Sequence, residues 1–105
     1  MPIDDFLTPG EEIRFSSTTK MRYGEKRYQV FITNKRLIMY ARRGTLMKSD
    51  DLVSIPLEEF HNVKYREEGL INRSGIIEFE GKTLVQMYGP PRDAKAIYQQ
   101  IMQFI

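Results

Sequence analysis

The segment YQVFITNKRLIMYARR, residues 28–43, decides the fold, because it holds two strand-like arms on either side of a tight turn. β-branched and aromatic side chains, which favour strands, are frequent in both arms. The polar residues Thr33 to Arg36 between the arms suit a turn. After the turn, residues 37–41 are apolar at every position, which is typical of a strand covered on both faces. The segment therefore predicts a hairpin whose second strand is well buried.

Period-two alternation and turn residues predict further strands on both sides of this hairpin. The clearest is 13–23, where Ser17 and Thr19 are small interruptions on an otherwise apolar face. Pro56 cannot donate to a strand ladder, so its strand is expected at a sheet edge or to end there. The other strands are expected at 52–57, 61–66, 76–80 and 83–88, with a loop at 43–51 and a helical turn at 58–60.

The C-terminal residues have the period of a helix. Pro90 and Pro91 stop the last strand and suit a first helical turn, and Asp93 complements the helix dipole. Apolar residues then recur at spacings of three and four. They are Ala94, Ile97, Tyr98, Ile101, Met102 and Ile105. We expect one amphipathic helix from about Pro91 to Ile105.

These elements predict a single mainly β (α+β) domain over residues 1–105. About seven short strands must bury one face of their sheet, and the helix has one apolar stripe to contribute. The expected architecture is a curved antiparallel sheet or partly open barrel, closed by the C-terminal helix.

Residues with catalytic or metal-binding chemistry are scarce. The chain has no cysteine, which excludes disulfides, thiolate zinc sites and cysteine nucleophiles. Its one histidine, His61, is expected to be partly packed at a strand end rather than to act as a base or ligand. No nucleophile elbow or glycine-rich phosphate loop occurs. We therefore expect no enzyme, no metal and no cofactor.

The N-terminal residues 1–12 are acidic and lack the basic start and apolar run of a signal peptide. No apolar stretch approaches the length of a membrane span. The absence of cysteine suits a reducing compartment. We expect a soluble, cytoplasmic protein.

Charge is strongly segregated along the chain, although the net charge is only +2. Residues 13–49 hold ten basic side chains against Glu25 alone, whereas residues 1–12 sum to −4 and residues 50–105 to −3. One interpretation is a one-sided surface field that attracts an anionic partner. The other is a set of solvated strand edges, where Lys and Arg prevent edge-to-edge pairing.

Three short motifs resemble the prokaryotic pleckstrin-homology-like (PH-like) domains. GEEI at residues 10–13 is followed by ITNKRLI at 32–38, and then by IPLEEF at 55–60 with Val63. In those domains a T-N-x-R-L hairpin precedes an I-P-L strand and a closing helix. The resemblance covers nearly the whole chain, and it implies a binding or assembly module.

The resemblance also implies where an anion could bind. In eukaryotic PH domains that bind phosphoinositides, the first two strands and their loop carry basic residues. The corresponding residues here are Lys20, Arg22, Lys26 and Arg27. Arginine offers a planar fork for phosphate oxygens, and lysine a mobile point charge. Strand alternation sends Lys26 and Arg27 to opposite faces, so only the tertiary structure decides whether the set converges.

Two functional hypotheses follow. The first is a non-enzymatic module that binds protein, itself included, through sheet edges or loops, which makes a homo-oligomer one expected form. The alternative is binding to anionic phospholipid headgroups or another polyanion through the basic first hairpin, at the inner face of the membrane. Nucleic-acid binding is disfavoured, because the aromatic residues near the basic ones fall at core positions and the net charge is modest.

Overall fold

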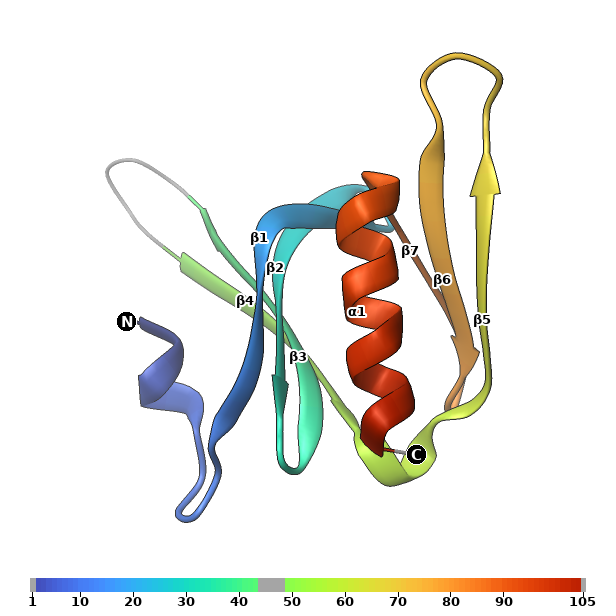
Figure 1. Ribbon diagram of the computed structural model, residues 1–105. Coiled ribbons are helices and arrows are strands. Elements are labelled where there is room, and N and C mark those ends of the chain that lie inside the picture. The colour runs from blue at the N-terminus through green and yellow to red at the C-terminus, as the bar shows by residue number, and fades with distance from the viewer. Residues whose placement is uncertain (1, 44–48, 105) are drawn as a thin grey trace.

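A seven-stranded antiparallel sheet and one long helix form the structure, a computed structural model that describes residues 2–43 and 49–104 (Figure 1). The strands are β1 (Ile13–Tyr23), β2 (Lys26–Thr33), β3 (Arg36–Arg43), β4 (Ser49–Pro56), β5 (His61–Glu68), β6 (Ser74–Glu80) and β7 (Leu84–Gly89). Two short 3-10 helices, η1 (Pro2–Phe6) and η2 (Leu57–Glu59), precede β1 and β5, and α1 (Pro91–Phe104) ends the described chain. The sheet order is β4-β3-β2-β1-β7-β6-β5.

The expected curved antiparallel sheet with a C-terminal helix is confirmed. β4 begins at Ser49, before the expected start, β5 continues to Glu68, and the helical turn begins one residue early at Leu57. The helix η1 was not expected at all. Most of the predicted 43–51 loop, and the predicted helix end at Ile105, lie outside the described residues.

Strand β1 joins the two halves of the sheet and bends between them. Its pairing with β2 shifts register between Ser16 and Lys20. Ser17 is buried at this irregularity, where its Oγ donates to the Thr19 carbonyl at 2.8 Å and accepts from the Val30 N–H at 2.9 Å. The interruption seen in the alternation therefore coincides with an irregularity in strand pairing, and such irregularities bend a strand and increase its twist. Beyond it, β1 pairs with β7 only at Arg22 and Tyr88.

The main core lies between the two halves of the sheet and the helix that covers them (Figure 1). Ala94, Ile97 and Ile101 of α1 are fully buried in it, as the helical stripe predicted. Met102 was predicted on the same stripe but is 45% exposed, because the stripe is wider than the contact at the end of the helix. Phe60 and Phe79 stack in this core with ring centroids 4.2 Å apart.

A second, smaller core covers the other face of β2 and β3. Ile3 of η1 packs there with Phe31, Ile38 and Tyr40. Strand β3 therefore contributes alternate residues to two cores, which confirms that it is covered on both faces.

The sheet is not closed into a barrel. In the sheet order, β4 and β5 are the two ends, and each has one strand neighbour. Pro56 is the last residue of β4, so the predicted edge position is confirmed. The open sheet leaves two edges that a closed barrel would have removed.

Candidate functional site

Two surface hollows lie near opposite ends of strand β2. The first surrounds the turn after β2 and has a volume of about 820 Å³. The second lies where β2 begins and has a volume of about 900 Å³. Both contain arginine and lysine, so the partners of these cations decide which hollow can bind a ligand.

Beside the first hollow, an ion pair and its hydrogen bonds hold the N-terminal segment to the turn between β2 and β3. We call Glu11, Thr33 and Arg36 the clasp. The Arg36 guanidinium donates from Nε to Glu11 Oε2 at 2.8 Å and from an Nη atom to Glu11 Oε1 at 3.0 Å. The Thr33 hydroxyl donates to Glu11 Oε2 at 2.6 Å. The Glu11 side chain has no exposed surface, and that of Arg36 retains 19%.

The hydrogen bond from Arg36 is the main reason that the pKa of Glu11 falls from 4.5 to about 2. Burial opposes this shift, while bonds from Thr33 and the Thr8 backbone add to it. A carboxylate held in this way is ionised in the folded protein and is already fully coordinated. The clasp therefore serves the architecture rather than a ligand.

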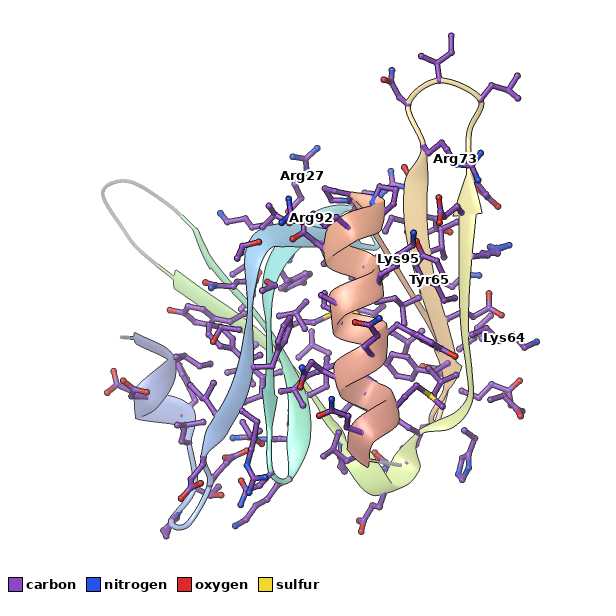
Figure 2. All side chains as sticks on the ribbon, viewed as in Figure 1. Arg27, Lys64, Tyr65, Arg73, Arg92 and Lys95 are labelled. Atoms are coloured by element: carbon purple, nitrogen blue, oxygen red, sulfur yellow. The ribbon has the colours of Figure 1, made fainter. Side chains whose placement is uncertain are left out.

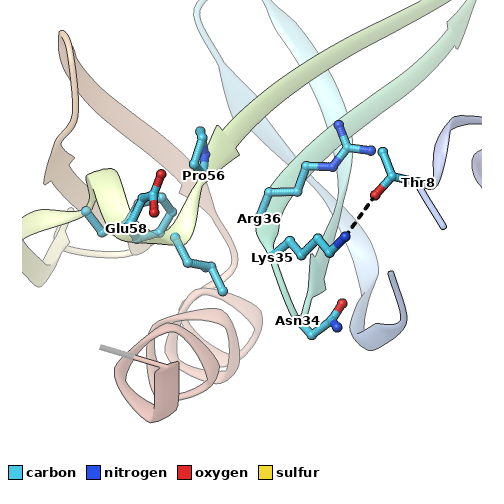
Figure 3. Close-up of a pocket in the computed structure, with 8 residues that line it drawn as sticks. Thr8, Asn34, Lys35, Arg36, Pro56 and Glu58 are labelled. Carbon is cyan, nitrogen blue, oxygen red and sulfur yellow. Dashed lines mark hydrogen bonds between the residues drawn. The ribbon is translucent and has the colours of Figure 1, made fainter. Parts of the chain in front are cut away.

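The cations that line the first hollow are engaged within the protein (Figure 3). Lys35 Nζ donates to the Thr8 hydroxyl at 3.4 Å and to the Pro9 carbonyl at 3.3 Å. Arg36 also donates to the Phe6 carbonyl at 2.7 Å. Arg36 is neutralised by Glu11, and Glu58 also lines this hollow, so the first hollow attracts an anion less strongly than the second.

The second hollow, which we call the basic groove, is formed by three separate parts of the sequence. These are the first hairpin, the loop between β5 and β6, and the junction of β7 with α1. The lining residues are Thr19, Lys20, Arg22, Arg27, Ile71, Asn72, Arg73, Ser74, Tyr88, Gly89, Pro90 and Pro91. Four of them are cationic and none is acidic.

The first hairpin supplies three of these cations. Within the described part of the chain, Lys20, Arg22 and Arg27 form no ion pair. Arg22 and Arg27 lie directly opposite each other across β1 and β2. Like charges in this arrangement repel and destabilise a sheet. Arg22 also lies over the Tyr88 ring, 4.7 Å from its centroid, which favours one position for its guanidinium.

Arg73 enters the groove from the opposite side and is fixed by a carboxylate. Its Nε donates to Glu67 Oε1 at 3.2 Å, while Lys95 of α1 lies 3.4 Å from the other Glu67 oxygen. The hydrogen bond from Arg73 is the main cause of the lowered pKa of Glu67, followed by one from Tyr65. Glu67 thus connects Arg73 to α1 through two ion pairs. About half of the Arg73 side chain stays exposed.

The beginning of α1 forms the floor of the groove. Pro90 and Pro91 line it, and the Ala94 N–H makes the first helical hydrogen bond to the Pro90 carbonyl at 2.9 Å. Gly75 allows this approach, because a Cβ there would lie 2.6 Å from the Cβ of Ala94. The positive end of the helix dipole therefore adds to the field of the four cations.

Three of the four predicted site residues converge and one does not. Lys20, Arg22 and Arg27 line the groove, whereas Lys26 forms an ion pair with Asp51 of β4 at 3.1 Å. Figure 2 shows Arg27 and Arg92 at the end of the molecule where α1 begins. Arg73 was not predicted, because no local pattern indicates that a residue so distant in sequence faces the first hairpin.

Other chemistry gives no competing site within the described residues. No group of acidic or histidine side chains there could hold a metal ion, and no buried side-chain polar atom lacks a hydrogen-bond partner. His61 is exposed rather than partly packed, at the start of β5 where the pairing with β6 shifts register between His61 and Lys64. No helix in the described ranges is long and apolar enough to cross a membrane.

An open antiparallel sheet covered by a C-terminal helix is the architecture of a PH-like domain. The bacterial PH domain family matches residues 7–103, so the chain belongs to that family. A crystal structure of a pleckstrin homology domain from Shewanella amazonensis SB2B shares the fold, with a TM-score of 0.71 at 17% sequence identity. That match covers 98% of this chain and 91% of the other. No curated protein matches the chain.

Proposed function

We propose that this domain is an interaction module whose basic groove binds a phosphate-bearing anion. PH-like membership supports an interaction module in general. The observation that carries the finer proposal is the set of four cations lining one groove, three of them without an ion pair in the described residues. This arrangement favours the anion-binding alternative over protein binding as the main role.

The physical argument rests on unsatisfied charge. Arg22 and Arg27 face each other, and nothing acidic in the groove lining neutralises them. A phosphate group between them would replace repulsion with charge-assisted hydrogen bonds, which are about twice as strong as neutral ones. Lys20 and Arg73 would bind further oxygens from the two sides of the groove.

The test compares two neighbouring residues. Arg27→Gln removes a groove cation, while Lys26→Gln removes the same charge from a residue that pairs with Asp51 instead. Binding of inositol hexakisphosphate, a water-soluble polyphosphate, is measured by calorimetry at low and moderate salt. We expect Arg27→Gln to weaken binding about ten-fold, the value of one hydrogen bond to a charged group.

Lys26→Gln should bind nearly as well as the wild type, and all affinities should fall as salt rises. Equal losses in the two variants would show that net charge, and not the groove, attracts the anion. Absence of binding by the wild type would overturn the proposal.

Self-association through a sheet edge is a second proposal. The observation that favours it is that β4 and β5 each have one strand neighbour. Such edges can pair between copies, although the charged residues Lys64, Arg66 and Glu68 along β5 oppose this. Light scattering after size-exclusion chromatography would show a salt-resistant oligomer if an edge pairs, and a monomer at all salt concentrations would refute it.

A further inference from the structure

The loop between β5 and β6 exposes two large apolar side chains beside the basic groove. Leu70 is 100% exposed and Ile71 is 91% exposed. The hairpin that carries them projects past the beginning of α1, beyond the rest of the sheet (Figure 1). Ile71 also lines the groove. A single exposed apolar side chain is common, but two adjacent ones at a projecting tip beside clustered cations indicate a binding surface.

The shape of the loop is supported by contacts within it. Gly69 has φ +107°, and a Cβ there would lie 2.8 Å from the Asn72 carbonyl oxygen. Arg73 closes the loop by donating to the Gly69 carbonyl at 3.0 Å and to Glu67 at 3.2 Å. The same arginine therefore shapes the tip and lines the groove. The apolar pair therefore lies on a loop that is closed by hydrogen bonds of its own.

We propose that Leu70 and Ile71 insert into an anionic lipid bilayer while the basic groove binds a headgroup phosphate of the same surface. This inference rests on the proposed function and names the source of the phosphate. The two side chains would enter the acyl boundary, where apolar residues of membrane-surface proteins lie. The four groove cations would lie at the level of the headgroups, where each basic residue near an anionic surface adds to binding.

A bilayer fits this surface better than a protein partner. The surface area of two adjacent side chains at a narrow tip is far smaller than the roughly 800 Å² that each partner buries in a specific protein interface. A bilayer needs no shape complementarity, and insertion of two apolar groups adds to electrostatic attraction from several cations. Charge complementarity and the apolar tip thus point to the same partner.

The chain has no tryptophan, so one introduced indole reports on its own surroundings. Leu70→Trp places it at the tip. Leu84→Trp is the matched control. Leu84 is also exposed, by 55%, but it lies at the first residue of β7, whereas the groove residue Gly89 is the last. With phosphatidylglycerol vesicles we expect a blue shift, and quenching by lipids brominated in their acyl chains, for Leu70→Trp alone. Equal responses, or no response, would overturn insertion.

Vesicle sedimentation then measures the contribution of the tip. Leu70→Ser, which leaves the groove-lining Ile71 in place, should weaken binding to phosphatidylglycerol vesicles roughly ten-fold, the value of burying one apolar side chain. The same variant should bind inositol hexakisphosphate like the wild type. If vesicle binding is unchanged while soluble-anion binding persists, the insertion proposal fails and the groove proposal stands. If neither ligand binds the wild type, both proposals fail.

A protein-docking role for the tip has a distinct signature. The indole of Leu70→Trp would then shift with protein concentration in the absence of vesicles, as two copies associate. Such a concentration-dependent shift without a vesicle response would overturn the bilayer proposal.

Discussion

The clasp and the basic groove use the same kind of residue in opposite ways. In the clasp, Arg36 is paired with a fully covered carboxylate and donates to a backbone carbonyl as well. In the groove, Arg22 and Arg27 face each other and form no ion pair within the described residues. The first arrangement stabilises the folded chain, and the second opposes it slightly.

The difference teaches how to assign a role to an arginine in a small domain. Charge that is neutralised within the protein holds elements together, so its loss shows in stability. Charge that is gathered without a counter-charge raises the surface potential, so its loss shows in binding. The predictions below separate these two effects.

The largest effect is expected for Arg36→Met, which keeps part of the side-chain stem and removes the guanidinium. Glu11 would remain buried without its main partner. Removing one member of a buried pair costs about 3–5 kcal/mol. Urea denaturation should show this loss in the free energy of unfolding. A loss as small as that of an exposed pair would mean that the clasp does not hold the N-terminal segment.

The pH dependence of stability gives the next effect. The pKa of Glu11 is lowered from 4.5 to about 2 in the folded protein. Its contribution is therefore complete above pH 4.5 and is lost as pH falls through about 2. The shift corresponds to about 3 kcal/mol. The difference in unfolding free energy between wild type and Glu11→Gln should shrink over this range, whereas a constant difference would contradict the lowered pKa.

The smallest effects on the free energy of unfolding are expected for substitutions of the neighbours Lys26 and Arg27. Lys26→Gln breaks the partly exposed pair with Asp51 and should cost up to about 1 kcal/mol. Arg27→Gln relieves repulsion with Arg22 and should be neutral or stabilising by a few tenths of a kcal/mol. Thermal unfolding of the two variants measures the contrast. The opposite ranking would mean that Arg27 is neutralised within the fold.

Much of the fold could be predicted, because hydrophobic period and turn chemistry are local. The hairpin at residues 28–43, the edge position of Pro56 and the helix after Pro91 were all indicated by neighbouring residues. The register shift at Ser17 was visible only as an interruption, since a polar residue on an apolar face does not indicate that the pairing changes. The small core under η1 was missed because, among the side chains of that segment that the structure describes, Ile3 alone is buried.

The candidate site was predicted in part. Lys20, Arg22 and Arg27 belong to one hairpin, so the sequence could indicate them together. It could not separate Lys26 from them, because its partner Asp51 lies on β4. Only the order of the strands in the sheet brings β4 near Lys26. Nor could the sequence indicate Arg73, which a different hairpin brings to the same groove.

The sequence by itself determined the strands, the helix and the excess of cations in the first third of the chain, because these depend on residues near one another. The tertiary structure alone decided which cations are neutralised and which gather in a groove beside an apolar tip. The physical reason is that charge pairing depends on distance in space, and the sheet brings together residues that are far apart along the chain.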